Sequence, residues 1–449
     1  MRTGYSRWKN PAELAVIAVL GLIALLIRLY YVRTAVVDHP VRGDAVQYLA
    51  YAMNLLNHHT FSIALPDAAT HAPDSFRDPG YSTFLAIIAS ITGMGQAFYE
   101  TLLDAQAVLG AVTAALYGVM VRRWISFGWA VVAAALLALW PHSISMGGYI
   151  LSETLMGFLV AASLWTLDTA LRSGKSWQGA LAGLAFACAA LTNAVVLPFA
   201  PLAGAWMLWR DGARRHFWGV FLIGVLVPAM AWGVRSMALP AGQSSGDRVA
   251  MNFVQGAWPE YHPEYIRSFQ GDPKAVGDMA AIDAEYRLLR SDRSQGLAAI
   301  GHRLGSDPVH YLGWYLSKPI ELWGWNIGIG QGDIYVFPTD NSPLTAGTFL
   351  RATTGLCFFI NPFVMLLAVA GLVLAIVGRR QTPAGLILAA ALGCFVTAVF
   401  GVLQSDARYA VPFRGIEVAL AMLSLAAAAK RLRVIREPDS GVTDGRSAS

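Results

Sequence analysis

The sequence predicts an all-α polytopic membrane protein, and three observations support this class. The chain has 449 residues, of which 56% are hydrophobic and 14% are charged, too apolar a composition for a soluble protein of this length. Apolar runs of about 20 residues, the length that crosses a bilayer as a helix, recur along most of the sequence. Strict alternation of apolar and polar residues is absent, which favours helices over a transmembrane barrel.

The first expected element is an uncleaved membrane anchor. The apolar run from Pro11 to Leu26 follows basic residues, as in a signal peptide, but it continues through Arg28 without a small-residue cleavage pattern. Arg28 could contact a phosphate or extend to lipid headgroups. We favour the headgroups, because a long side chain near a helix end reaches them easily.

Basic residues gather at the ends of apolar runs, so the net charge of +5 indicates membrane topology and not a nucleic-acid partner. We place these clusters in the cytoplasm: Arg2/Arg7/Lys9, Arg122/Arg123, Arg172/Lys175, Arg210/Arg214/Arg215, Arg379/Arg380 and Lys430/Arg431/Arg433. About ten crossings follow, with both termini inside. They are 12–32, 99–121, 128–146, 153–171, 177–192, 194–209, 216–238, 353–378, 383–404 and 410–429.

Two further apolar segments, Gly80 to Gly93 and Tyr311 to Gly328, are short or rich in interfacial aromatic residues, so we expect interfacial or re-entrant helices. If they cross, the count rises, which gives a bundle of about 10 to 13 helices. The expected organisation is a catalytic membrane module (1–238) with its first outer loop (33–98), a second outer region with small helices and an interfacial helix (239–352), C-terminal membrane helices (353–436) and a disordered tail (437–449).

The stretch from Val41 to Ser82 concentrates polar residues directly after the first span. Asp44, Tyr48 and Tyr51 fall at i, i+4 and i+7, on one face of a predicted helix. Asp44 has two interpretations with about equal support: a simple N-cap after Gly43, or a general base held at the membrane surface. The helix start would favour its ionised form.

Three other places carry charged residues that chemistry could use. Arg77 precedes a Pro-Gly turn and could clamp a phosphate with its planar guanidinium, or interact with lipid headgroups. Glu153 opens an apolar helix, as a capping-box residue or as a functional acid. Arg408, Tyr409 and Arg414 lie at the expected outer end of the last span, where positive charge needs an anionic partner. A lipid-linked phosphate or the protein's own carboxylates would serve.

No residue pattern requires a cofactor. The three cysteines lie in or beside apolar segments, the histidines have no metal-ligand spacing, and the sequence has no P-loop, dinucleotide-binding glycine pattern or Ser-His-Asp arrangement. A divalent metal remains compatible with the chemistry.

The order of these motifs resembles a known family. The chain has a first span, then RGDAVQYLAYAMNLLNHHTFS, FRDPGYSTFLAIIASITG and a helix that opens with SET, and later DARYAVPF. This order is similar to that of the C-type (GT-C fold) glycosyltransferases, in the branch of the protein O-mannosyltransferases, the lipid A aminoarabinose transferases and the rhizobial galacturonosyltransferases.

The resemblance implies an inverting transferase of the bacterial inner membrane. Such an enzyme moves one sugar from a polyprenyl-phosphate donor to a lipid, glycan or protein acceptor on the periplasmic side. Asp44 matches the catalytic acidic residue of the family's first loop, and Glu153 matches an acid that lines the cavity. The expected donor-phosphate and substrate-binding residues are Arg77, Tyr48, Asp78, Arg235, Arg408 and Tyr409, and no metal ligand is expected.

The sequence departs from the family at one turn. Many members carry a basic residue where this chain has Asn193, in LTNAVVLP, and Arg235 could compensate. Two other classes of function remain open: a transporter or flippase of a lipid-linked glycan, and a non-catalytic subunit of envelope assembly.

Overall fold

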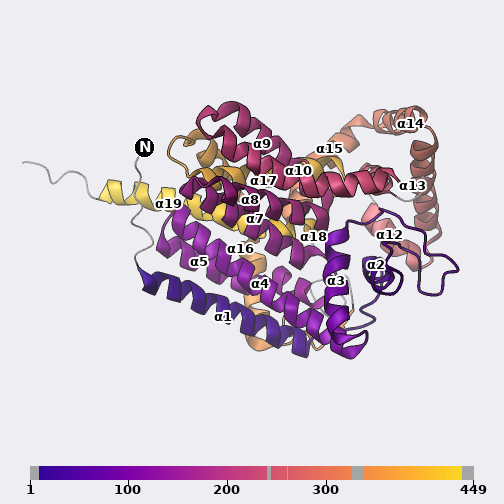
Figure 1. Cartoon of the computed structure of the whole chain (residues 1–449), viewed down its shortest axis with the longest axis horizontal. Helices are drawn as coiled ribbons and strands as arrows, with labels where there is room; N and C mark the ends of the chain where they lie inside the picture. The colour runs from indigo at the N-terminus through magenta and orange to yellow at the C-terminus, as the bar shows by residue number, and fades with distance from the viewer. Residues whose placement is uncertain (1–9, 240–243, 260, 326–337, 437–449) are drawn as a thin grey trace, which may run out of the picture.

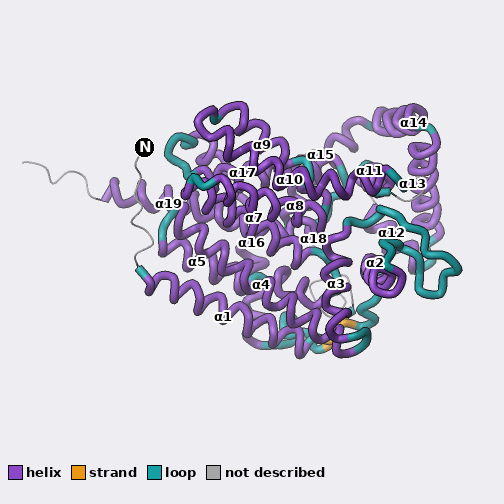
Figure 2. The backbone as a smooth tube through the Cα atoms, viewed as in Figure 1, coloured by secondary structure: helices purple, strands orange, loops and turns teal. Residues whose placement is uncertain are grey.

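The computed structural model describes residues 10–239, 244–259, 261–325 and 338–436. In these residues almost every element is an α-helix, which confirms the predicted all-α class (Figure 2). The basic residues Arg2, Arg7 and Lys9 and the tail 437–449 lie outside the described residues.

The first half of the chain supplies ten α-helices. They are α1 (Pro11–Thr34), α2 (Asp44–His58), α3 (Pro79–Thr92), α4 (Gln96–Trp124), α5 (Phe127–Leu139), α6 (Pro141–Ser145), α7 (Glu153–Ser173), α8 (Ser176–Thr192), α9 (Phe199–Arg210) and α10 (Arg215–Met237).

The second half supplies the other helices. They are α11 (Ser245–Gly256), α12 (Tyr261–Phe269), α13 (Pro273–Ser291), α14 (Arg293–Ser306), α15 (Pro308–Trp323), α16 (Thr348–Val377), α17 (Ala384–Val402), α18 (Ala407–Ala410) and α19 (Arg414–Arg436). Short 3-10 turns follow α6, α8, α9 and α18. The strands β1 (Val36–Val37) and β2 (Thr339–Asp340) form one antiparallel pair.

This is a multi-pass membrane protein. Among the described residues seven helices are long and apolar enough to cross a bilayer, and α5 with α6 adds an eighth if this pair, bent by 54°, is one span. The two shorter apolar helices at 176–192 and 194–210 occupy the other two predicted crossings. The predicted positions of the spans therefore coincide with apolar helices throughout.

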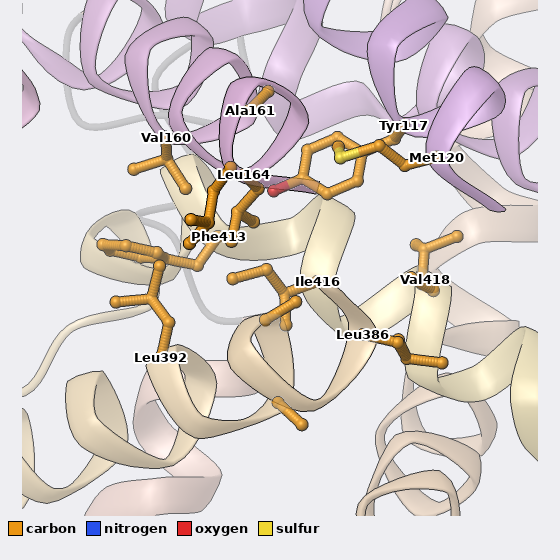
Figure 3. Packing of buried hydrophobic residues seen from close by; sticks show 14 of the residues in the cluster. Tyr117, Met120, Val160, Ala161, Leu164, Leu386, Leu392, Phe413, Ile416 and Val418 are labelled. Atoms are coloured by element: carbon orange, nitrogen blue, oxygen red, sulfur yellow. The ribbon is translucent and has the colours of Figure 1, made fainter. Parts of the chain in front are cut away.

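The core of the bundle forms where α4, α7, α17 and α19 meet. Tyr117 and Met120 of α4 lie near Val160 and Leu164 of α7, and the start of α19, with Ile416, packs against both helices (Figure 3). Gly415 allows this approach, because a Cβ at that position would overlap the Tyr117 ring. Close helix packing through small residues replaces the hydrophobic driving force that lipid removes.

The first loop lies between two short elements, strand β1 and helix α3, that connect it to the rest of the structure. Strand β1 follows α1 directly, and its Val36 pairs with Asp340 of β2. Helix α3 follows the loop and begins with Pro79, whose fixed φ suits the first helical turn. At 14 residues α3 agrees with the short helix predicted at 80–93.

The region 239–352 holds a separate group of helices. Helices α11 to α14 share a small core of their own, and they lie to one side of the bundle, at the right of Figure 1. Helix α15 carries an apolar stripe of Val309, Leu312, Leu316 and Ile320, each more than 60% exposed. Such a stripe is what an interfacial helix presents to lipid. Residues 326–328 of the predicted segment lie outside the described residues, and the domain boundaries remain predictions.

One expectation about the first span is wrong. Arg28 is only 2% exposed and does not reach toward headgroups. Its guanidinium donates hydrogen bonds to the carbonyl oxygens of Ala24, Leu137 and Ala138. The last two carbonyls lie at the C-terminal end of α5, where backbone acceptors lack partners within their helix. Arg28 therefore caps a neighbouring helix.

Candidate functional site

Asp44 is the centre of a charged cluster. Helix α2 begins at Asp44 after Gly43, whose φ of 54° suits a residue without a Cβ. The N-cap is Gly43 and not Asp44, so the simple capping interpretation does not describe this carboxylate. Its Oδ1 accepts a hydrogen bond from Arg77 Nη2 at 2.5 Å, and its Oδ2 accepts one from Arg408 Nη2 at 2.7 Å.

Arg77 comes from the loop that precedes α3. Besides Asp44, it donates from Nε to Gln47 Oε1 at 2.6 Å, and its guanidinium lies 5.1 Å from the centre of the Tyr48 ring. Gly80 fixes the turn after Arg77, because any side chain there would meet the backbone at the end of α8. The turn therefore sets Arg77 against the face of α2 that carries Asp44.

Arg408 connects this cluster to Glu153. Asp406 caps the short helix α18 by accepting a hydrogen bond from the Arg408 backbone N–H at 2.7 Å. The Arg408 side chain then forms ion pairs with Asp44 and with Glu153, the first residue of α7. The Tyr48 hydroxyl donates to Ser152 Oγ at 3.2 Å, one residue before Glu153. Three distant segments therefore meet at the Arg408 side chain.

The second oxygen of Glu153 faces the interior. Oε2 has no hydrogen-bond partner among the described residues, and neither does Nε of Arg28 or of Arg414. All three residues line a cavity of about 40 Å³. A cavity of that size with several polar partners can hold water. Glu153 thus connects the Asp44 cluster to a small cavity that three charged side chains line.

The charges around Asp44 determine its protonation. Burial raises the pKa of Asp44, but the positive charges of Arg77 and Arg408 outweigh burial and hold the pKa well below its usual range. Burial lowers the pKa of Arg77, but the charge of Asp44, the nearby Tyr48 and the hydrogen bond to Asp44 together raise it above its usual value. Burial also raises the pKa of Tyr48. Asp44 is therefore ionised, and it is a weak base while both arginines contact it.

The sequence matches no protein-family model and no curated protein sequence. Among solved structures, it is similar to the Archaeoglobus fulgidus oligosaccharyltransferase tethered with an acceptor peptide. The TM-score is 0.52 and the identity 15%, over 97% of this chain and 52% of that one. The apo form of that enzyme gives 0.50 and 15%, over 96% and 52%. ArnT from Cupriavidus metallidurans bound to undecaprenyl phosphate gives 0.37 and 15%, over 96% and 81%.

The chain has the C-type glycosyltransferase fold. It spans about half the length of the oligosaccharyltransferase structures that it matches. The likeness covers nearly all of this chain, so the fold expected from the motifs in the first loop and the DARYAVPF segment is confirmed.

Five of the eight predicted site residues lie together: Asp44, Tyr48, Arg77, Glu153 and Arg408. The other three make their hydrogen bonds elsewhere, although the Tyr409 ring lies 5.5 Å from the Arg408 guanidinium. Tyr409 stacks on Phe400 and donates its hydroxyl to Gln404 Oε1 at 3.0 Å. Arg235 donates to the carbonyl oxygens of Asp74 and Phe61 and lies over the Trp232 ring. That arginine fastens the first loop to α10.

Asp78 lies beside the turn that contains Asn193. Its Oδ2 accepts hydrogen bonds from the Ala194 backbone N–H at 3.0 Å and from Arg248 Nη2 at 2.5 Å. Asn193 uses its own side chain to accept from the Val195 backbone N–H. A basic residue is thus present beside this turn, but it is Arg248 of α11 and not Arg235.

Sequence reasoning missed Gln47, Ser152 and Arg248. Gln47 follows Asp44 by three residues, so it lies on the same helical face and the spacing could have identified it. Ser152 stands beside a residue that was predicted. Arg248 comes from a segment distant in sequence, and no local pattern links it to Asp78.

Within the described ranges, no group of three or more His, Cys, Asp or Glu side chains is arranged to hold a metal ion. The expectation that no cofactor is required stays a prediction.

Proposed function

We propose that this protein is an integral membrane glycosyltransferase. It would transfer a single sugar from a polyprenyl-phosphate donor to an acceptor hydroxyl, with inversion at the anomeric carbon, on the periplasmic face of a bacterial inner membrane. The observation that carries the proposal is the contact of one carboxylate, Asp44, with two guanidinium groups, those of Arg77 and Arg408.

The fold supports this class of reaction. The matched solved structures are of an oligosaccharyltransferase, an enzyme that acts on glycans and, in one structure, carries a tethered acceptor peptide. In this chain the charged cluster lies at the start of α7, a helix of spanning length, so a donor carried by a lipid could reach it from the bilayer.

The two arginines suit the leaving group. A planar guanidinium can bind a phosphate through two parallel hydrogen bonds, and positive charge in a partly dry site stabilises the negative charge that develops as the phosphate leaves. In the structure both arginines are occupied by Asp44, so a donor phosphate would have to compete with this carboxylate.

That competition would also activate the base. As Arg77 and Arg408 turn to the phosphate, Asp44 loses the charges that depress its pKa, and a nearby phosphate raises the pKa further. Asp44 would then accept the proton of the acceptor hydroxyl while the oxygen attacks the anomeric carbon. General-base help of this kind contributes about 10²- to 10⁴-fold. A single displacement inverts the anomeric configuration.

Two other functions could use the same fold: transport of a lipid-linked glycan, or a non-catalytic role in envelope assembly. In both, the arginines and Asp44 would be a structural ion-pair network. The three functions differ in what they require of Asp44, because only the enzyme needs this carboxylate to leave the arginines and accept a proton during turnover.

The test is an Asp44→Asn variant in a strain that lacks the chromosomal copy. Mass spectrometry of envelope glycolipids and glycans should show one sugar modification that is lost on deletion and restored by the wild-type gene. Asp44→Asn should fail to restore it, while the purified variant melts near the wild-type temperature and still binds undecaprenyl phosphate.

Asp104→Asn is the matched control. Asp104 pairs with Arg33 near the end of α1, and both side chains are at least one-third exposed. This variant should restore the modification fully. Full restoration by Asp44→Asn as well would remove the enzyme proposal.

A further inference from the structure

The helices outside the bundle enclose a hollow of their own. It has a volume of about 180 Å³ and lies between the end of α11, helix α12 and helix α13. Its lining combines two aromatic rings, three charged side chains and one aliphatic side chain: Trp258, Tyr261, Glu264, Lys274, Asp278 and Ile282. A concave lining that is partly apolar and carries a few placed polar groups is typical of a binding site.

Glu264 is the unusual member of this lining. It is 2% exposed, and its Oε1 accepts hydrogen bonds from Arg267 at 2.5 Å and from Lys274 at 3.3 Å. Its Oε2 has no hydrogen-bond partner among the described residues. A buried carboxylate oxygen without a donor is costly, so a group that donates a hydrogen bond from within the hollow would stabilise it.

The aromatic residues are held in place. Trp258 donates from its indole Nε1 to Glu285 at 2.8 Å, and the Arg303 guanidinium lies 4.3 Å from its ring centre. Tyr261 packs against the small core of these helices. Fixed aromatic rings offer a surface to the C–H face of a sugar ring, and carboxylates accept hydrogen bonds from its hydroxyl groups.

Helix α12 places the hollow next to the Asp44 cluster. His262 lies 3.7 Å from Asp406 and 3.3 Å from Gln404, in the turn that carries Arg408. Figure 1 shows α12 on the side of α13 that faces the bundle. Helix α12 therefore lies between the hollow and the turn that carries Arg408.

We infer that this hollow binds a neutral sugar residue of the acceptor, on the far side of α12 from the residue that receives the transferred sugar. The inference rests on the proposed function and narrows it, because the acceptor becomes a carbohydrate. The two carboxylates that line the hollow are paired with Lys274, and Arg267 also pairs with Glu264, so the described lining offers an anionic sugar no free cation. A hydroxyl of a neutral sugar can donate to Glu264 Oε2.

The experiment measures sugar binding directly, without turnover. The full chain in lipid nanodiscs is mixed with the methyl glycosides of glucose, N-acetylglucosamine and glucuronic acid, and saturation-transfer NMR reports which sugars bind. The two neutral glycosides should give signals, and the glucuronide should give none. Glu264→Gln and Tyr261→Ala should each weaken binding by about tenfold, because each removes one part of the lining.

Phe269→Ala is the matched control, since Phe269 is an aromatic residue of the same helix that is 76% exposed and outside the lining. It should leave the signals unchanged. Melting temperatures identify variants that fail to fold, and the isosteric Glu264→Gln keeps the test decisive if Tyr261→Ala unfolds.

The possible results separate this inference from the proposed function. No signal from either neutral glycoside, or equal signals with Glu264→Gln, would show that the hollow holds water only. Sugar signals that persist in Asp44→Asn, as expected, show that binding is independent of the reacting group. Binding to the hollow in a protein whose deletion alters no envelope glycan would remove the transferase proposal and leave a sugar-binding protein.

Discussion

Helix α7 carries a carboxylate–arginine cluster near each end, and the two differ in how completely they are satisfied. Glu153 and Asp168 are 15 residues apart, about 22 Å along the helix axis. At Asp168, Oδ1 accepts from Trp124 at 2.9 Å, and Oδ2 accepts from Arg123 at 3.2 Å and Arg172 at 2.8 Å. The Asp168 side chain is 3% exposed.

The cluster at the other end is open. The Asp44 side chain is 28% exposed and Arg408 22%, and Glu153 keeps one oxygen without a partner among the described residues. A cluster that is closed and saturated has no capacity to bind anything else, whereas an open one can exchange an internal partner for a ligand. We therefore assign stability to the Asp168 cluster and propose chemistry for the Asp44 cluster.

The largest expected effects come from removing the carboxylate at the centre of each cluster: one variant should lose stability and the other activity. Asp168→Asn should destabilise the protein by about 3–5 kcal/mol, because it leaves Arg123 beside a neutral partner in a buried place. Activity per folded molecule should remain near that of the wild type. Asp44→Asn should lower transfer by about 10²- to 10⁴-fold with a much smaller change in stability. Thermal melting in nanodiscs and a transfer assay on the same samples measure both quantities. If Asp168→Asn lost activity while melting normally, the assignment would be reversed.

A smaller effect is expected when the arginines are replaced by lysines. Arg77→Lys and Arg408→Lys keep the charge but lose the planar pair of donors, so the KM for the lipid-linked donor should rise by about tenfold in each. Arg172→Lys, at the saturated cluster, provides the comparison and should leave KM unchanged. Equal KM values across the three variants would mean that the open cluster does not bind the phosphate.

The pH dependence of the reaction should report the exchange of partners. Arg77 and Arg408 lower the pKa of Asp44 in the free protein, and donor binding would remove these contacts, so the pKa in the bound complex should be higher. A base must be deprotonated, so the rate falls as the pH drops through its pKa. The acid limb of kcat should therefore lie at higher pH than that of kcat/KM, by about one unit or more. Coinciding limbs would indicate that the arginines stay on Asp44 during turnover.

The same lowered pKa has a consequence for stability. Because the folded pKa of Asp44 is below its unfolded value, its ion pairs contribute stability above about pH 4, and this contribution is lost as the pH falls toward the folded pKa. Asp44→Asn should therefore flatten the dependence of the melting temperature on pH below about pH 5.

The smallest effect is expected at an exposed pair. Arg33 and Asp104 form an ion pair with side-chain exposures of 60% and 35%. Such pairs contribute about 0–1 kcal/mol, so Arg33→Gln should change neither the melting temperature nor transfer measurably. A clear loss of either would show that exposure alone does not separate the classes of ion pair in this protein.

Much of the fold was predictable because lipid constrains it. Composition and run length fix the helices, and the predicted spans match observed apolar helices from α1 to α19. The positions of charged residues were less predictable. Arg122 and Arg123 were predicted from topology alone, yet they are 4% and 6% exposed and pair with Glu13 and Asp168. The number of basic residues at the end of an apolar run does not show which of them are buried in ion pairs.

The site was predictable where its parts are close in sequence. Asp44 and Arg77 belong to one polar loop, and Glu153 and Arg408 stand out as charged residues at the expected ends of apolar helices; the resemblance to a family then suggested their roles. Neither the local sequence pattern nor the resemblance predicted which side chains pair. Arg408 contacts Asp44 from 364 residues away in the sequence, and helical or strand spacing predicts contacts only between residues close in sequence. The contacts of Arg235 with the carbonyls of Asp74 and Phe61 could not be foreseen either, because a guanidinium that binds backbone leaves no side-chain pattern.

The distance in sequence between Asp44 and Arg408 also bears on how the molecule is made. During synthesis the first loop leaves the ribosome long before α18. Asp44 could then pair with Arg77 early, but it could pair with Arg408 only after nearly the whole chain has been inserted. The last membrane helices would therefore complete the reacting centre, and a nascent chain that stopped short of them would carry every early part of the site in an inactive form.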